Sequence, residues 1–324
     1  MKKVAVVIPN YNGMKFVKTC LDSVEEQNYD DLEIIVVDNY STDGSYEFIK
    51  ENYPDVILKR MDKNYGFSIA VNTGIKMADS EYVLLLNNDT EVDENFVSEL
   101  VSKIDSDKSI FSCSAKMINY YDREIMDDAG DLYTILGWAF QRGIGRSIEE
   151  YCYEKDVFAS CAGAAIYRKE LFDKVGLFDE MHFAYLEDID VGYRARILGY
   201  RNVYHPRAKV YHMGSATSGS KYNSFKVKLS ARNNIYLVYK NTPAWQAILN
   251  FPFLCLGFGV KYSFFKKIGF DKDYVDGLKE AFKTLYKCKR VKFDSEKHKN
   301  CLRLEIEMIM ATFQYAVDYM KRHI

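Results

Sequence analysis

Residues 82–89 read Tyr-Val-Leu-Leu-Leu-Asn-Asn-Asp, and this stretch decides the fold class. Five apolar or aromatic residues that stop abruptly at polar side chains predict a short strand buried on both faces. Two earlier stretches have the same form: Val4–Ile8 stops at Pro9-Asn10-Tyr11, and Leu32–Val37 stops at Asp38. We therefore expect several buried strands, each with polar residues at its carboxyl end.

Segments with helical periodicity lie between these strands. Apolar residues recur at helical spacing in Phe16–Val24, and Ser68–Ala78 fits another helix. A shorter helix through Phe48 and Ile49 and a strand at Val56–Leu58 complete the alternation. Strands separated by helices of this length predict an α/β fold, with a mostly parallel, doubly wound sheet flanked by helices.

Ligands of such sheets bind beyond the carboxyl ends of the strands. Pro9 and Tyr11, Asp38, and Asp89 follow three different strands, so we expect them at one rim of the sheet. Asp89 is a natural ligand for a hard cation such as Mg²⁺ or Mn²⁺, which would neutralise a departing diphosphate. Taken alone, Asp89 is equally well explained as a helix cap or a turn residue.

Glu187 and Asp188 are adjacent carboxylates at the start of a predicted helix. The helix dipole stabilises the ionised form there, and an ionised carboxylate can remove the proton of an attacking hydroxyl. Asp188 is therefore a candidate general base. His212 follows a predicted short strand at Ala208–Tyr211 and is a candidate third metal ligand. An acidic helix start and a structural histidine are the ordinary alternatives.

The segment Asn119–Asp156 is irregular and rich in glycine, and it predicts an insertion over the sheet with Trp138 and Phe140 exposed. The following stretch, Val157–Tyr167, is apolar and contains Ala162-Gly163-Ala164-Ala165. We predict a single strand there, against which another segment packs closely.

The ordered set of these motifs resembles the inverting family 2 glycosyltransferases of GT-A fold, especially their rhamnosyltransferase-like group. The matching stretches run in the family's order and cover roughly residues 4–215. They are Val6–Asn12, Val36–Asn39, Ser41–Ser45, Asn64–Phe67, Asn72–Gly74, Leu84–Asp89, Gly163–Ala165, Gly176–Glu180, Glu187–Asp190 with Arg194, Gly199-Tyr200 and His212.

This resemblance implies roles for individual residues. Nucleotide binding falls to Pro9, Tyr11, Asp38, Asn64, Asn87 and Asn88. Asp89 would hold Mg²⁺ or Mn²⁺ with help from His212, and Asp188 would be the base. In this sequence Asn87 stands where the family's first metal-motif aspartate stands, so Asp89 alone supplies charge there.

Four further residues are assigned to acceptor binding or to support of the site. They are Glu187, Trp138, Arg194 and Arg232. Arg232 lies in Ser230-Ala231-Arg232-Asn233-Asn234, which also resembles the rhamnosyltransferase-like group. It would meet an acceptor phosphate or, as an alternative of equal weight, form a salt bridge in the core.

The character of the chain changes after residue 220, which predicts a catalytic domain at 1–220 and a helical, basic and aromatic region at 221–324. That region has 20 Lys and Arg against 9 Asp and Glu, or +11, whereas the whole chain is at −2 and the first 220 residues are therefore at −13. Within it, Ala244–Val260 is largely apolar, with Lys261, Lys266 and Lys267 behind it. The run is short of a clean membrane span and predicts an interfacial segment, with a buried helix pair as the alternative.

Composition narrows the remaining possibilities. The basic residues lie among Phe, Leu and Ile, which argues against nucleic-acid binding. Seven cysteines without a Cys-x-x-Cys pair predict reduced thiols. The apolar start at Val4–Ile8 is too short for a signal peptide. These features predict a cytoplasmic protein, peripheral to the inner face of the cell membrane.

The sequence thus predicts a metal-dependent inverting glycosyltransferase. Its donor would be a dTDP- or UDP-sugar, with rhamnose suggested by the resemblance, and its acceptor a glycan or a lipid-linked glycan. A catalytically silent sugar-nucleotide or lipid-binding module is the alternative from another class. A sugar nucleotidyltransferase would need a basic Gly-rich loop near the N-terminus, and no Arg or Lys stands in Pro9–Gly13.

Overall fold

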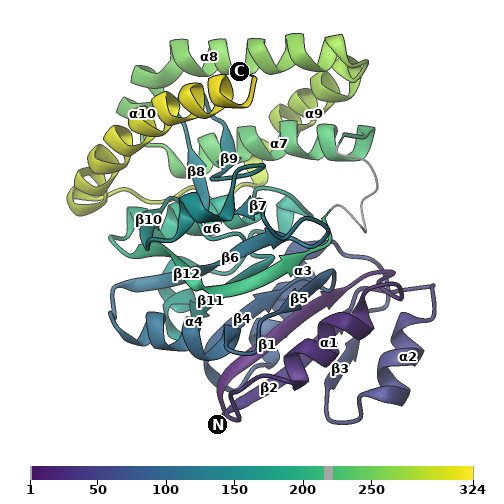
Figure 1. Ribbon diagram of the computed structural model, residues 1–324. Coiled ribbons are helices and arrows are strands. Elements are labelled where there is room, and N and C mark those ends of the chain that lie inside the picture. Colours follow the sequence, from purple (N-terminus) through teal and green to yellow (C-terminus); the bar gives the residue numbers. More distant parts are fainter. Residues whose placement is uncertain (1, 215–221, 324) are drawn as a thin grey trace.

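The computed structural model describes residues 2–214 and 222–323, and it has the predicted α/β architecture (Figure 1). Four N-terminal strands form a parallel half-sheet in the order β3–β2–β1–β4. They are β1 (Lys2–Asn10), β2 (Leu32–Asp38), β3 (Ile57–Arg60) and β4 (Ser80–Leu86). The strands expected from the apolar runs are confirmed.

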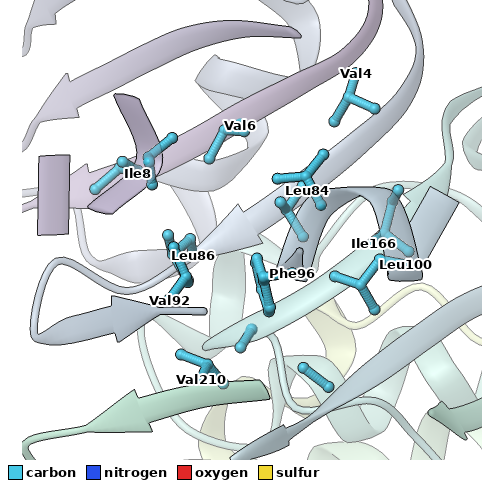
Figure 2. Packing of buried hydrophobic residues seen from close by; sticks show 14 of the residues in the cluster. Val4, Val6, Ile8, Leu84, Leu86, Val92, Phe96, Leu100, Ile166 and Val210 are labelled. Carbon is cyan, nitrogen blue, oxygen red and sulfur yellow. The ribbon is translucent and has the colours of Figure 1, made fainter. Parts of the chain in front are cut away.

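Helices cover both faces of this half-sheet, which explains why its strands are apolar throughout. Successive residues of a strand point to opposite faces, so Val4, Val6 and Ile8 join one core and Ala5 and Val7 the other. Figure 2 shows the first core, in which Phe96 and Leu100 pack near β1 and β4. The covering helices are α1 (Val17–Glu25), α2 (Ser45–Asn52) and α3 (Phe67–Met77), and α4 (Phe96–Asp105) extends the first core over the other half of the sheet.

The second half of the sheet mixes strand directions. β11 (Ala164–Arg168) lies antiparallel between β4 and β6 (Ile110–Asn119). β12 (Arg201–His212) runs parallel to β6, and its two ends pair antiparallel with β10 (Lys155–Val157) and β5 (Thr90–Val92). The pairing with β5 carries His212 to the side of Thr90, next to Asp89.

Two predicted strands differ in the structure. The single strand over Val157–Tyr167 is wrong, because β10 ends at Val157 and β11 begins at Ala164. Between them the backbone turns to bond other segments: Ala159 O accepts from Asp131 N, and Gly163 O accepts from Asn87 N. The strand over Ala208–Tyr211 is really the end of β12, whose register shifts between His205 and Lys209, around Pro206.

The irregular middle segment adds small strands beside the main sheet. β7 (Met126–Asp128) pairs with β6, and β8 (Asp131–Tyr133) forms a hairpin with β9 (Ala139–Gln141). Trp138, which we expected to be exposed, is half-buried at the tip of this hairpin, and its Nε1 donates to the carbonyl of Gly257, 3.1 Å away.

Helices make up most of residues 222–323 and form a layer over one end of the α/β unit (Figure 1). They are α7 (Ser224–Asn241), α8 (Ala244–Lys267), α9 (Asp271–Thr284) and α10 (Ser295–His323). The predicted boundary at residue 220 lies outside the described residues. α8 is longer than the predicted apolar run: its 24 residues are by length and composition enough to cross a membrane.

Candidate functional site

One cleft of about 970 Å³ opens at the carboxyl ends of β1 and β4. It is bounded by these strand ends, by the start of α6 (Glu187–Ile197), by the β8–β9 hairpin and by α7. The residues with predicted roles that line it are Pro9, Tyr11, Asn64, Asn87, Asn88, Asp89, Glu187, Asp188 and His212. Positions 89 and 188, which are far apart in the sequence, therefore face the same cleft.

Asp89 and His212 form one end of this constellation. His212 Nε2 lies 3.4 Å from Asp89 Oδ1, and the backbone N–H of Met213 donates to the Asp89 carbonyl at 2.9 Å. Two ligands of one Mg²⁺ or Mn²⁺ ion, each at about 2.1 Å, stand about 3 Å apart in octahedral geometry. The spacing and donor types of Asp89 and His212 therefore fit a divalent cation.

Asp127 holds the other side of the His212 ring. Its Oδ2 lies 2.6 Å from His212 Nδ1, an arrangement that leaves Nε2 directed at Asp89. Burial by itself lowers the pKa of His212, but the two flanking carboxylates prevail and raise that pKa to about 10. Without a metal the protonated imidazole is thus favoured, and a cation bound at Nε2 would take the place of that proton between the two carboxylates. Sequence reasoning missed Asp127, because only the pairing of β7 with β6 brings it near His212.

Asp188 stands near the beginning of α6, beyond a strained loop. Phe183, Tyr185 and Leu186 all have positive φ, at 64°, 72° and 67°, which non-glycine residues rarely adopt. The Asp188 carboxylate accepts from the N–H of Ile189 at 2.8 Å. Burial nevertheless raises the pKa of Asp188 above the ordinary aspartate value. A desolvated carboxylate of this kind is a stronger base than one in water.

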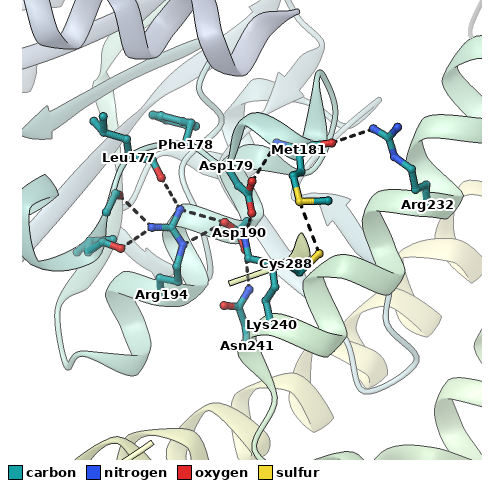
Figure 3. A network of polar contacts seen from close by, with 12 residues as sticks. Leu177, Phe178, Asp179, Met181, Asp190, Arg194, Arg232, Lys240, Asn241 and Cys288 are labelled. Carbon is teal, nitrogen blue, oxygen red and sulfur yellow. Dashed lines mark hydrogen bonds and ion pairs between the residues drawn. The ribbon is translucent and has the colours of Figure 1, made fainter. Parts of the chain in front are cut away.

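A pair of side chains from α7 holds this loop in place. Asn233 is fully buried, and its Nδ2 lies 3.0, 2.9 and 2.8 Å from the carbonyl oxygens of His182, Ala184 and Tyr185. Arg232 donates to the carbonyls of Met181 and His182, each at 3.0 Å, and the Met181 contact appears in Figure 3. Strained backbone persists where its surroundings fix it, and here α7 does so.

The predicted supporting arginines take part in these internal contacts. Arg232 also forms an ion pair with Glu280 at 2.8 Å, which matches the salt-bridge alternative. Arg194 binds Asp190 and the carbonyls of Val175, Gly176 and Leu177 (Figure 3). Within the described part of the chain, Arg194, Arg232 and Trp138 do not line the cleft.

An asparagine network shapes the side of the cleft next to β1 and β2. Asn10 Nδ2 donates to Asp38 Oδ1 at 2.8 Å, and Asn39 Nδ2 donates to Asn64 Oδ1 at 2.9 Å. Asp38 is fully buried behind Asn10 and, unlike Asn10, is not part of the lining. Asn88 Nδ2 in turn donates to Asn10 Oδ1 at 2.8 Å. The predicted nucleotide side is therefore prearranged by amides, with Asp38 behind them.

A second group of acidic residues lies beside the cleft. The ligand atoms of Asp128, Asp131 and Cys161 lie within 4.8 Å of one another, and Asp131 and Cys161 line the cleft. Burial first, and then the neighbouring acids Asp128 and Asp188, raise the pKa of Asp131 well above its ordinary value. The sequence does contain the Asp128-Ala129-Gly130-Asp131 turn. Nothing in the residue pattern indicated that Asp131 of this turn would lie close enough to Asp188 to interact with it.

Comparison with known proteins settles the family. The model of "Glycosyl transferase family 2" matches residues 5–176, which is just over half of the chain. The chain belongs to glycosyl transferase family 2. It is thereby placed in a family of transferase enzymes, as the resemblance predicted.

Individual relatives of this family 2 chain are more distant. Glycosyltransferase GlyA of Streptococcus pneumoniae is 31% identical over 56% of this chain and 26% of its own length. An N-acetylglucosaminyl-diphospho-decaprenol L-rhamnosyltransferase of Mycobacterium tuberculosis is 24% identical over 75% of this chain and 87% of its own. The chain spans only 26%, 34% and 58% of the length of three curated relatives that it matches.

Solved structures support the GT-A fold. A mannosyltransferase from Pyrobaculum calidifontis, solved with GDP-Man and Mn²⁺, superposes on 98% of this chain and 88% of its own. The TM-score is 0.53 at 17% identity. A likeness at this identity concerns the fold alone. The aligned part of the chain includes the C-terminal helices.

The loop before Asp188 offers a structural test. We expect Asn233→Ala to lower the free energy of unfolding by about 1–3 kcal/mol, because buried carbonyls lose their donor. Amide hydrogen exchange of residues 181–188 should rise by more than the global change. Asn52→Ala is a matched control, since its amide donates to the carbonyl of Phe48 at an exposed site. Equal exchange in both variants would contradict a clamping role for Asn233.

Proposed function

We propose that the protein transfers a sugar from a nucleoside diphosphate donor to an acceptor hydroxyl, with inversion at the anomeric carbon. The observation that carries the proposal is that Asp89, His212 and Asp188 face one cleft at the carboxyl end of the sheet. A cation-binding pair and a desolvated carboxylate are the two groups that such a single displacement needs.

Each group has a separate task. Asp89 and His212 would hold Mg²⁺ or Mn²⁺, which supplies positive charge for the departing diphosphate. Asp188 takes the proton of the acceptor hydroxyl as its oxygen attacks the anomeric carbon. Pro9, Tyr11, Asn64, Asn87 and Asn88 would contact the nucleotide from the β1 and β4 side, with Asp38 supporting Asn10 from behind. Arg194 and Arg232 would be supporting residues that fix the position of Asp188.

The proposed donor is a dTDP- or UDP-sugar, with rhamnose as the first sugar to test. The rhamnosyltransferase-like motifs and the similarity to the mycobacterial L-rhamnosyltransferase support this choice. A glycan or lipid-linked glycan is the proposed acceptor, in polysaccharide synthesis for the cell envelope. The proposed location is the cytoplasm, at the inner face of the membrane, which the exposed apolar side chains of α8 support.

Asp188→Asn should abolish sugar transfer and leave donor affinity within about threefold of wild type, because an amide cannot accept the proton. Thermal stability should be unchanged or higher, since a buried charged form is removed. Transfer is measured with purified nucleotide sugars, and donor affinity by calorimetry with Mn²⁺. Turnover equal to wild type would refute the role of base. Donor binding without any wild-type turnover would favour the silent binding module.

The pH dependence of wild-type kcat/KM provides a second test. The base must be ionised, so activity should fall as the pH decreases through the raised pKa of Asp188. We therefore expect the acidic limb to lie above the ordinary aspartate pKa of about 3.9. Because Asp188 and the neighbouring carboxyls titrate together, the acidic limb of the profile reports the cluster of carboxyls and not Asp188 alone. A limb at or below the usual value, with donor binding constant over the range, would contradict a desolvated base.

Asp127 should control the metal site through His212. Asp127→Ala should weaken Mn²⁺ binding by about 10–100-fold, because the partner of Nδ1 is lost. Asp127→Asn should be weakened less, since the amide oxygen can still accept from Nδ1–H. Mn²⁺ affinity is measured by electron paramagnetic resonance without donor or acceptor. The exposed Glu124→Ala is the control, and identical affinities in all variants would exclude this role.

A further inference from the structure

α8 has the reverse of the usual helix pattern. A helix at the surface of a soluble protein buries its apolar residues and exposes its polar ones. In α8 the buried residues are Gln246, Asn250 and Gly257. Its outer side exposes Ile248, Leu249, Phe251, Phe253, Leu256, Val260, Tyr262 and Phe264. The side chains that α8 buries fully are therefore polar or absent, Phe258 and Phe265 pack partly buried against α7 and α9, and most of its other apolar groups face outward.

Besides its packing on α9, α8 makes a polar inward contact with α10. Glu305 of α10 is buried, and its Oε2 accepts from Gln246 Nε2 at 2.6 Å and from Asn250 Nδ2 at 2.9 Å. The two helices lie together at the edge of the helical layer (Figure 1). Buried hydrogen bonds to a carboxylate are costly to break, so they fix α8 on the protein.

α10 also exposes a set of large apolar side chains. Its inner side packs into the protein through Cys301, Leu304 and Met308. Its outer side exposes Leu302, Ile306, Ile309, Met310, Phe313, Val317 and Met320. We call the exposed apolar side chains of α8 and α10 together the two-helix surface. Large apolar side chains that are exposed together on neighbouring helices are typical of contact sites.

We propose that the two-helix surface docks the protein onto an anionic lipid bilayer, with α8 and α10 lying on the membrane. Lys266 and Lys267 are exposed at the end of α8, and residues 221–324 carry +11. Basic residues beside an apolar helix face are attracted to anionic headgroups. The same charge opposes a second copy of the chain as the partner, because two like-charged regions would meet.

Docking on the surface fits the contacts of α8 better than spanning does. To cross a bilayer, α8 would have to leave Glu305 unpaired and give up the bond from Trp138 Nε1 to the Gly257 carbonyl. Gly257 also sits tightly on the hairpin, since a Cβ there would lie 2.2 Å from Leu136 O. These inner contacts are all kept when only the outer side enters the interface.

The β8–β9 hairpin connects this surface with the cleft. Asp131 and Gln141, at its base, line the cleft, and Leu136 and Trp138, at its tip, touch α8. A strand rises about 3.3 Å per residue, so a three-residue strand and its turn span roughly 10–15 Å. If the proposed function holds, on which this step rests, the acceptor hydroxyl belongs to a lipid-linked molecule and enters the cleft close to the headgroup region.

The test uses the full-length protein and sedimentation with vesicles. We expect binding to phosphatidylcholine vesicles that contain phosphatidylglycerol, and at least about tenfold less binding for the double variant Phe251→Glu/Phe313→Glu. Both side chains are exposed, at 65% and 71%, so folding is kept. The control is Tyr121→Glu, which is 71% exposed elsewhere and should bind as wild type does. Lys266→Gln/Lys267→Gln should lose binding several-fold only when phosphatidylglycerol is present.

Two readouts keep the outcomes distinct. Trp138 and Trp245, the protein's two tryptophans, both lie at α8, so brominated lipids should quench their fluorescence in wild type and not in the double variant. Donor hydrolysis with Mn²⁺ should be equal in wild type and all variants. If neither wild type nor any variant hydrolysed a donor, the proposed function would be contradicted, and the docking proposal would still be decided by the vesicle binding. Equal vesicle binding by wild type and the double variant would overturn docking. A lipid-free dimer that the double variant abolishes would assign the two-helix surface to a second copy instead.

Discussion

The carboxylate of Asp190 is the buried charge that joins the two parts of the molecule. It is fully buried in α6, within 2.9 Å of Lys240 Nζ, 2.8 Å of Asn241 Nδ2 and 3.0 Å of Arg194 Nε (Figure 3). Burial raises its pKa, but the two cations outweigh burial and hold the pKa of Asp190 far below the ordinary range. Removing one partner of such a network leaves an uncompensated charge, at a cost of about 3–5 kcal/mol. The network therefore ties α6 firmly to α7.

This tie makes the C-terminal helices part of the site. Asp188 lies two residues before Asp190, so the position of the candidate base is set by the ion pair with Lys240 of α7. The same helix supplies Asn233 and Arg232 to the strained loop and lines the cleft with Phe225. The N-terminal unit and the C-terminal helices therefore both contribute to the site. The first supplies the sheet rim, and the second fixes the carboxylate that faces it.

The sequence predicted those parts of the fold and the site that depend on local pattern. Apolar runs gave β1, β2 and β4, and their carboxyl ends located Tyr11 and Asp89 on one cleft. The pattern failed at Val157–Tyr167, where the apolar residues line a turn that bonds Asp131 and Asn87. Asp127 and Asn233 could not be found in this way. Their partners are 85 and about 50 residues away, and only strand pairing and helix packing bring them together.

The distribution of polar and apolar side chains on α8 relates the fold to the proposed membrane contact. α8 buries Gln246, Asn250 and Gly257 fully and packs Phe258 and Phe265 partly, so most of its apolar side chains gain little from the hydrophobic effect on folding. Its place is fixed by Glu305, by the hairpin tip and by the packing of Phe258 and Phe265, and the apolar side chains on its outer side remain in contact with water. Burying them in the membrane interface would recover that free energy without any change in the inner contacts. The hairpin that fixes α8 also walls the cleft, so whatever orients the two-helix surface orients the cleft with it.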